Sequence, residues 1–300
     1  MKNTIKVYGI IAIIAVIAFS TAACGKKNKG GGSSGSDGGA DVSGVNVDDA
    51  LAMAKSAAAL ADSASKMSGS GSGSSGSARS GTSNSASDFK YDLSKDGSGI
   101  VITQFTNEKA ARVTIPNKIE DMPVVEIGKY AFSSGVKNKE EIVSITLPNT
   151  VKKIGDRAFA NTGITSMTLP NGLIEIGDLA FYESKLTNIT VPDSVTTIGD
   201  RAFSGCDSMT EARLSDNITV IPTAAFYQNH KLKKVKLPKN LTEIRELAFA
   251  FCEDLSDLTI PDTISSLKIN ANLVGAFKGC GKLPIKTRQR LKELGYTGDF

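Results

Sequence analysis

The chain has no tryptophan and only one histidine, His230, among its 300 residues. Ser-His-Asp and Cys-His mechanisms need a histidine beside a nucleophile. No such grouping can be assembled around His230, which we expect to be a solvent-facing loop residue. The excess of positive charge is also small, at +4, and it gives no reason to expect nucleic acid as a partner. We therefore expect a protein that is not an enzyme and that has no cofactor.

Long apolar stretches are scarce as well. The stretch from Val7 to Phe19 has thirteen residues, whereas a membrane-spanning helix needs about 20. It follows Lys2 and Lys6, and it is followed by small residues at 20–23 and then by Cys24. A short apolar run between positive charge and small residues is typical of a secretory signal peptide.

The residues before Cys24 resemble the lipobox of bacterial lipoproteins, in which the cysteine becomes the lipidated first residue of the mature chain. Thr21 stands where that motif usually has leucine. The resemblance implies a lipoprotein signal peptide over residues 1–23 and a membrane anchor at Cys24. A plain cleaved signal peptide and an uncleaved anchor are the alternatives, and all three export the chain.

Residues 24–87 consist largely of glycine, serine and alanine. Such a composition lacks the apolar surface that would offset the entropy of ordering, so we predict a flexible tether. The segment 47–67 interrupts it with strong helix formers. Most of its apolar residues are alanine, which predicts a marginal exposed helix, with a docking segment as the alternative.

From residue 88 onward the sequence repeats itself. The letters IGDRAF occupy 154–159 and 198–203, and IGDLAF occupies 176–181. Successive Ala-Phe pairs place phenylalanines 27, 22, 22, 23, 23 and 28 residues apart, at positions 132, 159, 181, 203, 226, 249 and 277. A fixed period of 22–23 residues predicts a solenoid, in which stacked coils bury a continuous core that a single coil could not form.

One unit, residues 186–206, shows the expected structure of a coil. A first strand runs to Pro192, which ends it because proline cannot donate to a ladder. A second extended piece follows at 195–198, and Gly199 then turns the chain. We expect Asp200 to cap a single helical turn that delivers a buried Phe203. Phe89 should lie at the fraying N-terminal edge of the repeat domain, where its truncation should matter much less than that of Phe203.

The unit L-x-x-I-x-L-P-x-x-L-x-x-I-G-x-x-A-F-x-x-C resembles the BspA-like bacterial leucine-rich repeats, including their treponemal type, over Phe89 to Phe300. Ser215, Pro222 and Arg245 depart from the pattern. The resemblance implies a leucine-rich repeat solenoid of short β-strands and single helical turns, with six to seven repeats, an N-terminal hairpin cap and a C-terminal helical cap ending at Gly295. We divide it into a cap with the first repeat (88–130), repeats (131–280) and a C-terminal cap (281–300).

Two columns of equivalent residues could carry chemistry. Cys206, Cys252 and Cys280 each stand three residues after a ladder phenylalanine. We predict reduced, buried thiols, and a disulfide between Cys252 and Cys280 is the alternative because their coils would be adjacent. A column of aspartates, Asp156, Asp178 and Asp200, suggests calcium. Neighbouring arginines and the expected capping role argue against it, so we expect no metal.

Outward positions of the first strands change in character along the chain. Side chains alternate across a strand, so the residues that flank each middle apolar position should face solvent. They are neutral in the early repeats and charged in the later ones. The candidate ligand-binding residues are Asn188, Thr190, Glu211, Arg213, Lys234 and Lys236. An ordinary solvated surface is the alternative.

The family resemblance implies a surface-exposed binding protein, often for host or matrix proteins. We therefore expect an exported, lipid-anchored, monomeric protein of the bacterial cell surface that binds a protein or matrix ligand through the first-strand sheet, in the manner of an adhesin. The alternative is a structural scaffold of the cell envelope without a diffusible ligand.

Overall fold

The computed structural model describes residues 83–265, 268–269 and 275–300. The chain divides into two units, 1–78 and 79–300, and all described residues belong to the second. The predicted signal peptide, Cys24, the segment 47–67 and the tether up to residue 82 lie outside the described residues. Within the described ranges, no helix is both long enough and apolar enough to cross a membrane.

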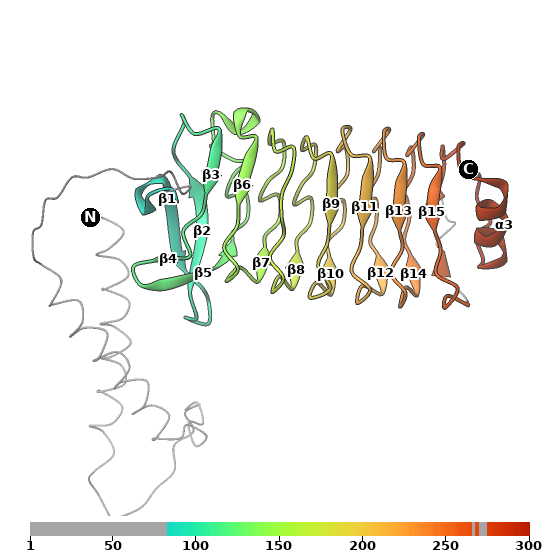
Figure 1. The fold of residues 1–300 in the computed structure, drawn as a ribbon, viewed down its shortest axis with the longest axis horizontal. Helices are drawn as coiled ribbons and strands as arrows, with labels where there is room; N and C mark the ends of the chain where they lie inside the picture. The colour runs from blue at the N-terminus through green and yellow to red at the C-terminus, as the bar shows by residue number, and fades with distance from the viewer. Residues whose placement is uncertain (1–82, 266–267, 270–274) are drawn as a thin grey trace, which may run out of the picture. The chain divides into compact units, whose positions relative to one another are not determined.

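The described unit is a β-solenoid in which most coils contribute one strand to each of two faces (Figure 1). One face, the first-strand sheet, contains β3 (Arg112–Thr114), β6 (Ser144–Thr146), β9 (Asn188–Thr190), β11 (Glu211–Arg213), β13 (Lys234–Lys236) and β15 (Asp257–Thr259). The other, the second-strand sheet, contains β5 (Met122–Ile127), β7 (Lys153–Ile154), β8 (Glu175–Ile176), β10 (Thr197–Ile198), β12 (Val220–Ile221), β14 (Glu243–Ile244) and β16 (Lys268–Ile269).

Neighbouring strands of both sheets are parallel and keep equivalent residues in register. Ala212 of β11 pairs with Ile189 of β9 on one side and with Val235 of β13 on the other. Each of these middle residues is buried, because alternate side chains of a strand point to the same face. The solenoid predicted from the 22–23-residue period, and the leucine-rich repeat architecture implied by the family resemblance, are thus confirmed.

An antiparallel hairpin begins the solenoid, as predicted. It joins β1 (Phe89–Leu93) to β2 (Ile100–Phe105) around Gly97, whose φ of 70° suits a residue without a Cβ. The short helix η1 (Ala86–Asp88) precedes it, and β2 pairs in parallel with β5. The small strand β4 (Lys118–Ile119) pairs antiparallel with β5, and the short helix η2 (Lys139–Glu141) occupies the longest insertion before β6.

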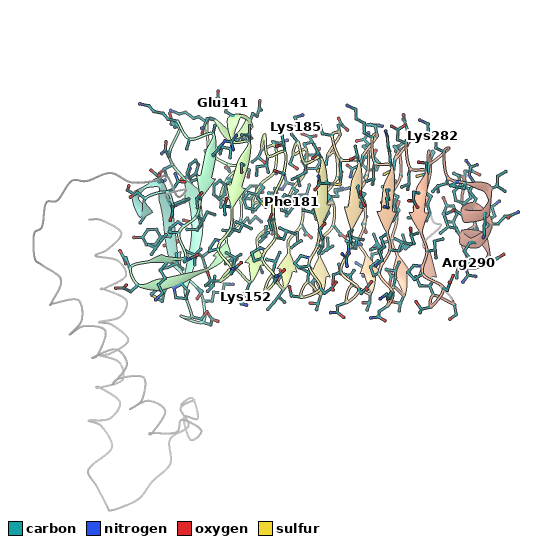
Figure 2. The ribbon with its side chains drawn as sticks, in the orientation of Figure 1. Glu141, Lys152, Phe181, Lys185, Lys282 and Arg290 are labelled. Atoms are coloured by element: carbon teal, nitrogen blue, oxygen red, sulfur yellow. The ribbon has the colours of Figure 1, made fainter. Side chains whose placement is uncertain are left out.

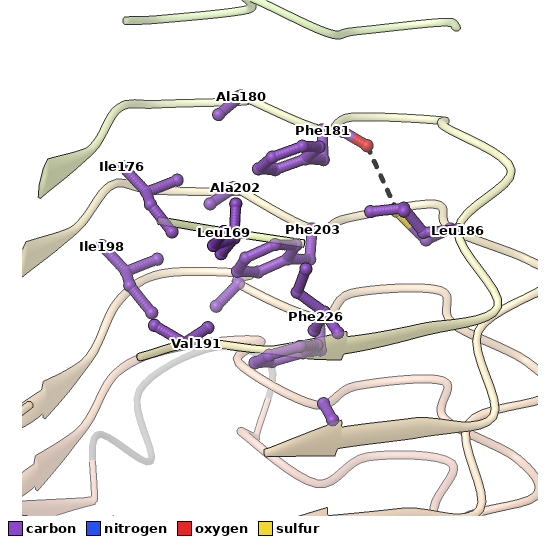
Figure 3. Close-up of a cluster of buried hydrophobic side chains, with 14 of the residues drawn as sticks. Leu169, Ile176, Ala180, Phe181, Leu186, Val191, Ile198, Ala202, Phe203 and Phe226 are labelled. Atoms are coloured by element: carbon purple, nitrogen blue, oxygen red, sulfur yellow. Dashed lines mark hydrogen bonds between the residues drawn. The ribbon is translucent and has the colours of Figure 1, made fainter. Parts of the chain in front are cut away.

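The ladder of phenylalanine rings forms the centre of the core (Figure 3). The ring centroids of Phe181 and Phe203 are 5.4 Å apart, and Phe203 and Phe226 repeat that distance. The ladder is longer than the Ala-Phe pairs predict, because Phe105 stacks on Phe132 at 5.3 Å and Phe89 on Phe105 at 5.5 Å. Phe89 is 3% exposed, because pairing of β1 with β2 holds this first ring of the ladder against Phe105.

The predicted C-terminal cap is the helix α3 (Ile285–Glu293). Gly295 has a φ of 108°, and its N–H donates to the carbonyl oxygen of Lys292 while the N–H of Tyr296 donates to that of Leu291, both at 3.0 Å. These two bonds are those of a Schellman motif, which ends a helix at a left-handed residue. The chain then places Tyr296 edge-on against Phe277, with the two centroids 5.3 Å apart.

The expected single helical turn before each phenylalanine is not helical. Arg201 and Gly205, two residues before and after Phe203, have φ values of 56° and 70°. Because these residues have left-handed backbone conformations, the N–H group of every second residue in the turn points along the solenoid axis towards the next coil. The N–H of Phe203 therefore donates to the carbonyl oxygen of Ala225 in the next coil at 3.0 Å, and the turns form a third ladder between coils.

Asp200 also differs from its predicted role, since its side chain does not cap its own turn. Its Oδ1 accepts the N–H of Thr223 in the next coil at 3.0 Å. Asp178 accepts the N–H of Asp200 at 2.8 Å, and Asp156 accepts that of Asp178 at 3.2 Å. The aspartate column therefore fastens one coil to the next.

Pro222 interrupts the second-strand sheet between β10 and β12. At the equivalent position Gly199 donates its N–H to the carbonyl oxygen of Ile176 at 2.8 Å, and Arg245 donates to that of Ile221 at 2.9 Å. Proline has no N–H to donate. Ser215, which replaces the strand-end proline of that coil, is buried, and its hydroxyl donates to the carbonyl oxygen of Val195 at 2.8 Å.

Candidate binding surface on the first-strand sheet

The register of the first-strand sheet brings the six predicted surface residues together in two rows. Asn188, Glu211, Lys234 and Asp257 pair successively along one row, and Thr190, Arg213, Lys236 and Thr259 along the other. All are exposed except Lys236, which is half-buried. The buried middle residue of each strand separates the rows. The sequence thus predicted the proximity of these residues, because a constant repeat length stacks equivalent positions.

Charges within the first row neutralise one another. Lys234 Nζ lies 3.4 Å from Glu211 Oε1, and Lys234 also pairs in register with Asp257 on its other side. One lysine between two carboxylates leaves this row without excess positive charge. Lys234 is one of the predicted ligand-binding residues, and in the structure its ammonium group already has Glu211 as a partner.

The second row keeps its positive charge. Arg213 and Lys236 lie directly opposite each other on β11 and β13, and neither makes an ion pair with a described residue within 4.0 Å. Like charges in directly opposed positions destabilise a sheet. This pair is therefore the electrostatically unsatisfied part of the surface.

One acidic residue, Asp216, lies beside the basic coil beyond the sheet face, and its environment is basic. Burial works to raise the pKa of Asp216, but hydrogen bonds from Lys239 and the charges of Lys239 and Lys236 outweigh it and lower that pKa. Lys239 Nζ lies 3.2 Å from Asp216 Oδ2. Asp216 and Lys239 are 23 residues apart, so aligning successive repeats would have predicted their contact from the sequence. The outward strand positions do not include either residue.

Charged side chains elsewhere lie along the margins of the coils. Figure 2 shows Phe181 inside the stack and Lys152, Lys185 and Lys282 at its edges. Lys282 is hydrogen-bonded to Asp254 at 2.5 Å. His230 is half-buried at such an edge, with Nδ1 3.4 Å from Glu253 Oε1. It is not fully solvent-facing, but it has no nucleophile for a partner.

The three described cysteines are free and buried. The thiol of Cys206 donates to the carbonyl oxygen of Phe181 at 3.2 Å (Figure 3), and Cys252 and Cys280 make the same bond to Phe226 and Phe249 at 3.1 Å. Burial raises the pKa of Cys206 to about 12. These protonated thiols bind adjacent coils, which matches the predicted structural role.

The same buried position holds Asn229 in the coil between Cys206 and Cys252. Its Oδ1 accepts the N–H of Cys206 at 2.8 Å. The sequence analysis missed this residue, although its place three residues after Phe226 marks it. As for metals, the described residues contain no group of three or more His, Cys, Asp or Glu side chains that could hold an ion, and the aspartate column is occupied by main-chain N–H groups.

Comparison with known proteins shows to which family the sequence is similar. A family model described as the BspA type leucine rich repeat region matches in six copies, over residues 98–184, 125–256 and 152–283. No curated protein matches significantly.

Two solved structures are among the similar ones. A leucine-rich repeat protein of T. pallidum is 30% identical, with a TM-score of 0.65, and the match covers 73% of this chain and 99% of that one. A leucine-rich repeat protein of Bacteroides ovatus is 26% identical over 61% of this chain and 54% of that one, with a TM-score of 0.45. Because the family model spans more than half of the sequence and the T. pallidum match covers nearly all of that protein, the chain belongs to the BspA-type leucine-rich repeat family.

Proposed function

We propose that this protein is a bacterial cell-surface binding protein that holds an extracellular macromolecule, a protein or matrix ligand, on its first-strand sheet. One observation carries the proposal: Arg213 and Lys236 lie opposite each other on adjacent strands without an ion-pair partner among the described residues. The repulsion between them costs stability in the free protein. An acidic group on a ligand would relieve it, and rigid repeat arrays commonly bind through such broad faces.

Reversal of this pair tests the proposal. The full chain carrying Arg213→Glu and Lys236→Glu should capture less ligand from a soluble extracellular-matrix extract than the unchanged chain. Association should weaken most at low salt, because rim charges act chiefly on the association rate. Lys118→Glu with Lys152→Glu is the matched control, since both lysines are exposed outside the first-strand sheet and the change in charge is equal. Equal capture by both double variants would contradict the proposal.

The proposed anchor is a lipid on Cys24, and the support for it is the apolar stretch and the small residues before this cysteine. Metabolic labelling with a radioactive fatty acid should mark the unchanged chain and leave Cys24→Ala unlabelled. The anchor also separates this proposal from the scaffold alternative. A binding protein captures ligand whether or not it is lipidated, whereas a scaffold crosslinks to envelope neighbours and needs Cys24 to reach them.

A further inference from the structure

The first-strand sheet is interrupted at residues 166–168, between β6 and β9 (Figure 1). An isolated bridge from Ser144 to Ser166 is what remains of the strand there. Main-chain bonds still join this coil to its neighbours just before the interruption, because the N–H of Thr165 donates to the carbonyl oxygen of Val143 at 3.2 Å and that of Thr187 donates to the carbonyl oxygen of Thr165 at 3.0 Å.

Met167 is the middle residue of the interrupted segment. Its counterparts in β6 and β9 are Ile145 and Ile189, both buried, whereas Met167 is half-buried. The segment therefore presents part of a thioether side chain to solvent at the interruption.

A depression of about 380 Å³ lies over this interruption. Its polar side chains are all uncharged, and its floor includes Met167 and Pro170. Apart from a bond from Asn188 to the hydroxyl of Thr187 at 3.3 Å, these polar side chains make no hydrogen bonds with described residues. They comprise three serines or threonines in exposed positions (Thr146, Ser166, Thr168), half-buried Ser144, and three exposed asparagines (Asn149, Asn171, Asn188).

A second depression, of about 300 Å³, continues from the first at Asn171, which lines both. Thr190, Asp193 and Arg213 are among its other lining residues. Ser194 also lines it, and the hydroxyl oxygen of Ser194 is buried without a hydrogen-bond partner among the described residues.

We propose that the joined depressions bind a neutral oligosaccharide that lies across the coils. Sugar hydroxyls both donate and accept hydrogen bonds, as do the hydroxyl and amide groups that line the site. Charged ligands gain little over the first depression, which has no charged side chain. Met167, which is half-buried, offers apolar surface to the C–H face of a ring. Coils repeat at a strand spacing of about 4.8 Å, which is close to the length of one pyranose unit.

This inference rests on the proposed function and names a ligand class for the neutral part of the same sheet. The two can fail separately, because the proposed function is tested by charge reversal with matrix extract, whereas the oligosaccharide site is tested at Asn171 and Asn188, which carry no charge. If no neutral glycan binds while that charge reversal still abolishes capture, the oligosaccharide site is wrong and the binding function stands.

The test applies the full chain to an array of neutral tri- and tetrasaccharides built from glucose, galactose, mannose and N-acetylhexosamine. We expect at least one to bind, and titration of that glycan should show a tenfold or greater loss of affinity for Asn171→Ala with Asn188→Ala. Thr259→Ala, at the far end of the same sheet, is the control and should bind normally. Thermal melting should be unchanged in both variants.

Three results would overturn the proposal. The first is an array on which no neutral glycan binds. The second is equal affinity in the asparagine double variant and the unchanged chain. The third is full displacement of the glycan by an uncharged serine-glycine peptide at the same concentration, which would show a general peptide groove.

Discussion

Phe203 has a ring neighbour on each side, at 5.4 Å from both Phe181 and Phe226. It is fully buried, so truncation removes contacts with two other coils at once. We predict that Phe203→Ala lowers the free energy of unfolding by about 3–5 kcal/mol, the usual cost of removing a buried phenylalanine side chain. Urea titration followed by circular dichroism measures the change.

Phe89→Ala is the matched comparison for that prediction. Phe89 is also buried, but Phe105 is its one ring neighbour in the ladder. Its truncation should therefore shift the urea midpoint in the same direction and by less. A larger shift for Phe89→Ala than for Phe203→Ala would show that the middle of the ladder does not carry the greater share of stability.

At the scale of elements, the strands and turns of one coil are completed by the next coil. Each ladder phenylalanine donates its N–H to the following coil, as Phe249 does to Ala276 at 2.8 Å. The last coil has no successor to accept such bonds. The segment after α3 takes that place, because the N–H of Phe277 donates to the hydroxyl oxygen of Tyr296 at 3.4 Å.

Tyr296 therefore ends the ladder of turns in two ways: its hydroxyl oxygen accepts the last N–H of the ladder, and its ring packs against the last phenylalanine. Its hydroxyl also donates to the carbonyl oxygen of Asp299 at 2.6 Å, and its side chain is buried. We predict that Tyr296→Phe keeps the edge-on ring contact and loses about 1–3 kcal/mol, the cost of leaving a buried donor unsatisfied. Amide hydrogen exchange should speed up at Phe277. Unchanged exchange there would mean that the hydroxyl is not a cap.

At the scale of the whole described unit, the two interruptions fall at different coils. The first-strand sheet is broken at residues 166–168, where β7, β8 and β10 continue the second-strand sheet. The second-strand sheet is broken at Pro222, where β9, β11 and β13 continue the first. The phenylalanine ladder passes through both places. Each junction between coils therefore keeps at least two lines of contact, which favours cooperative unfolding of the stack.

Without a cap, the last coil of the solenoid would expose apolar core side chains and would associate with other copies of the protein. Solenoids need capping units because the last coil otherwise exposes its core. In this chain Tyr296 and Phe300 cover Phe277, with centroids at 5.3 and 6.5 Å. We predict that deletion of residues 284–300 turns a monomer into concentration-dependent oligomers, which sedimentation velocity would detect. The point variant Tyr296→Phe should stay monomeric, and a truncated chain that also stays monomeric would contradict the capping role.

The sequence by itself determined the period, the core and both caps. Alternation within each short strand marks Ile189 and Val191 as inward, and the constant 22–23-residue spacing stacks the phenylalanines. The period and the core follow from the pattern of a single repeat, because equivalent residues of every coil are buried against the neighbouring coils, whereas the caps are marked by the departures from that pattern at the two ends. The same constancy predicted which surface residues become neighbours on the first-strand sheet.

The tertiary structure decided how neighbouring coils use their polar groups. It turned Asp200 from a cap of its own turn into an acceptor for Thr223, paired Lys234 with Glu211, and opened a depression over Met167. Each outcome depends on the distance and direction between two coils. A pattern within one repeat fixes which side chains point outward, but hydrogen bonds and ion pairs act over a few ångströms between chain segments 22 or 23 residues apart, and only the folded stack sets those distances.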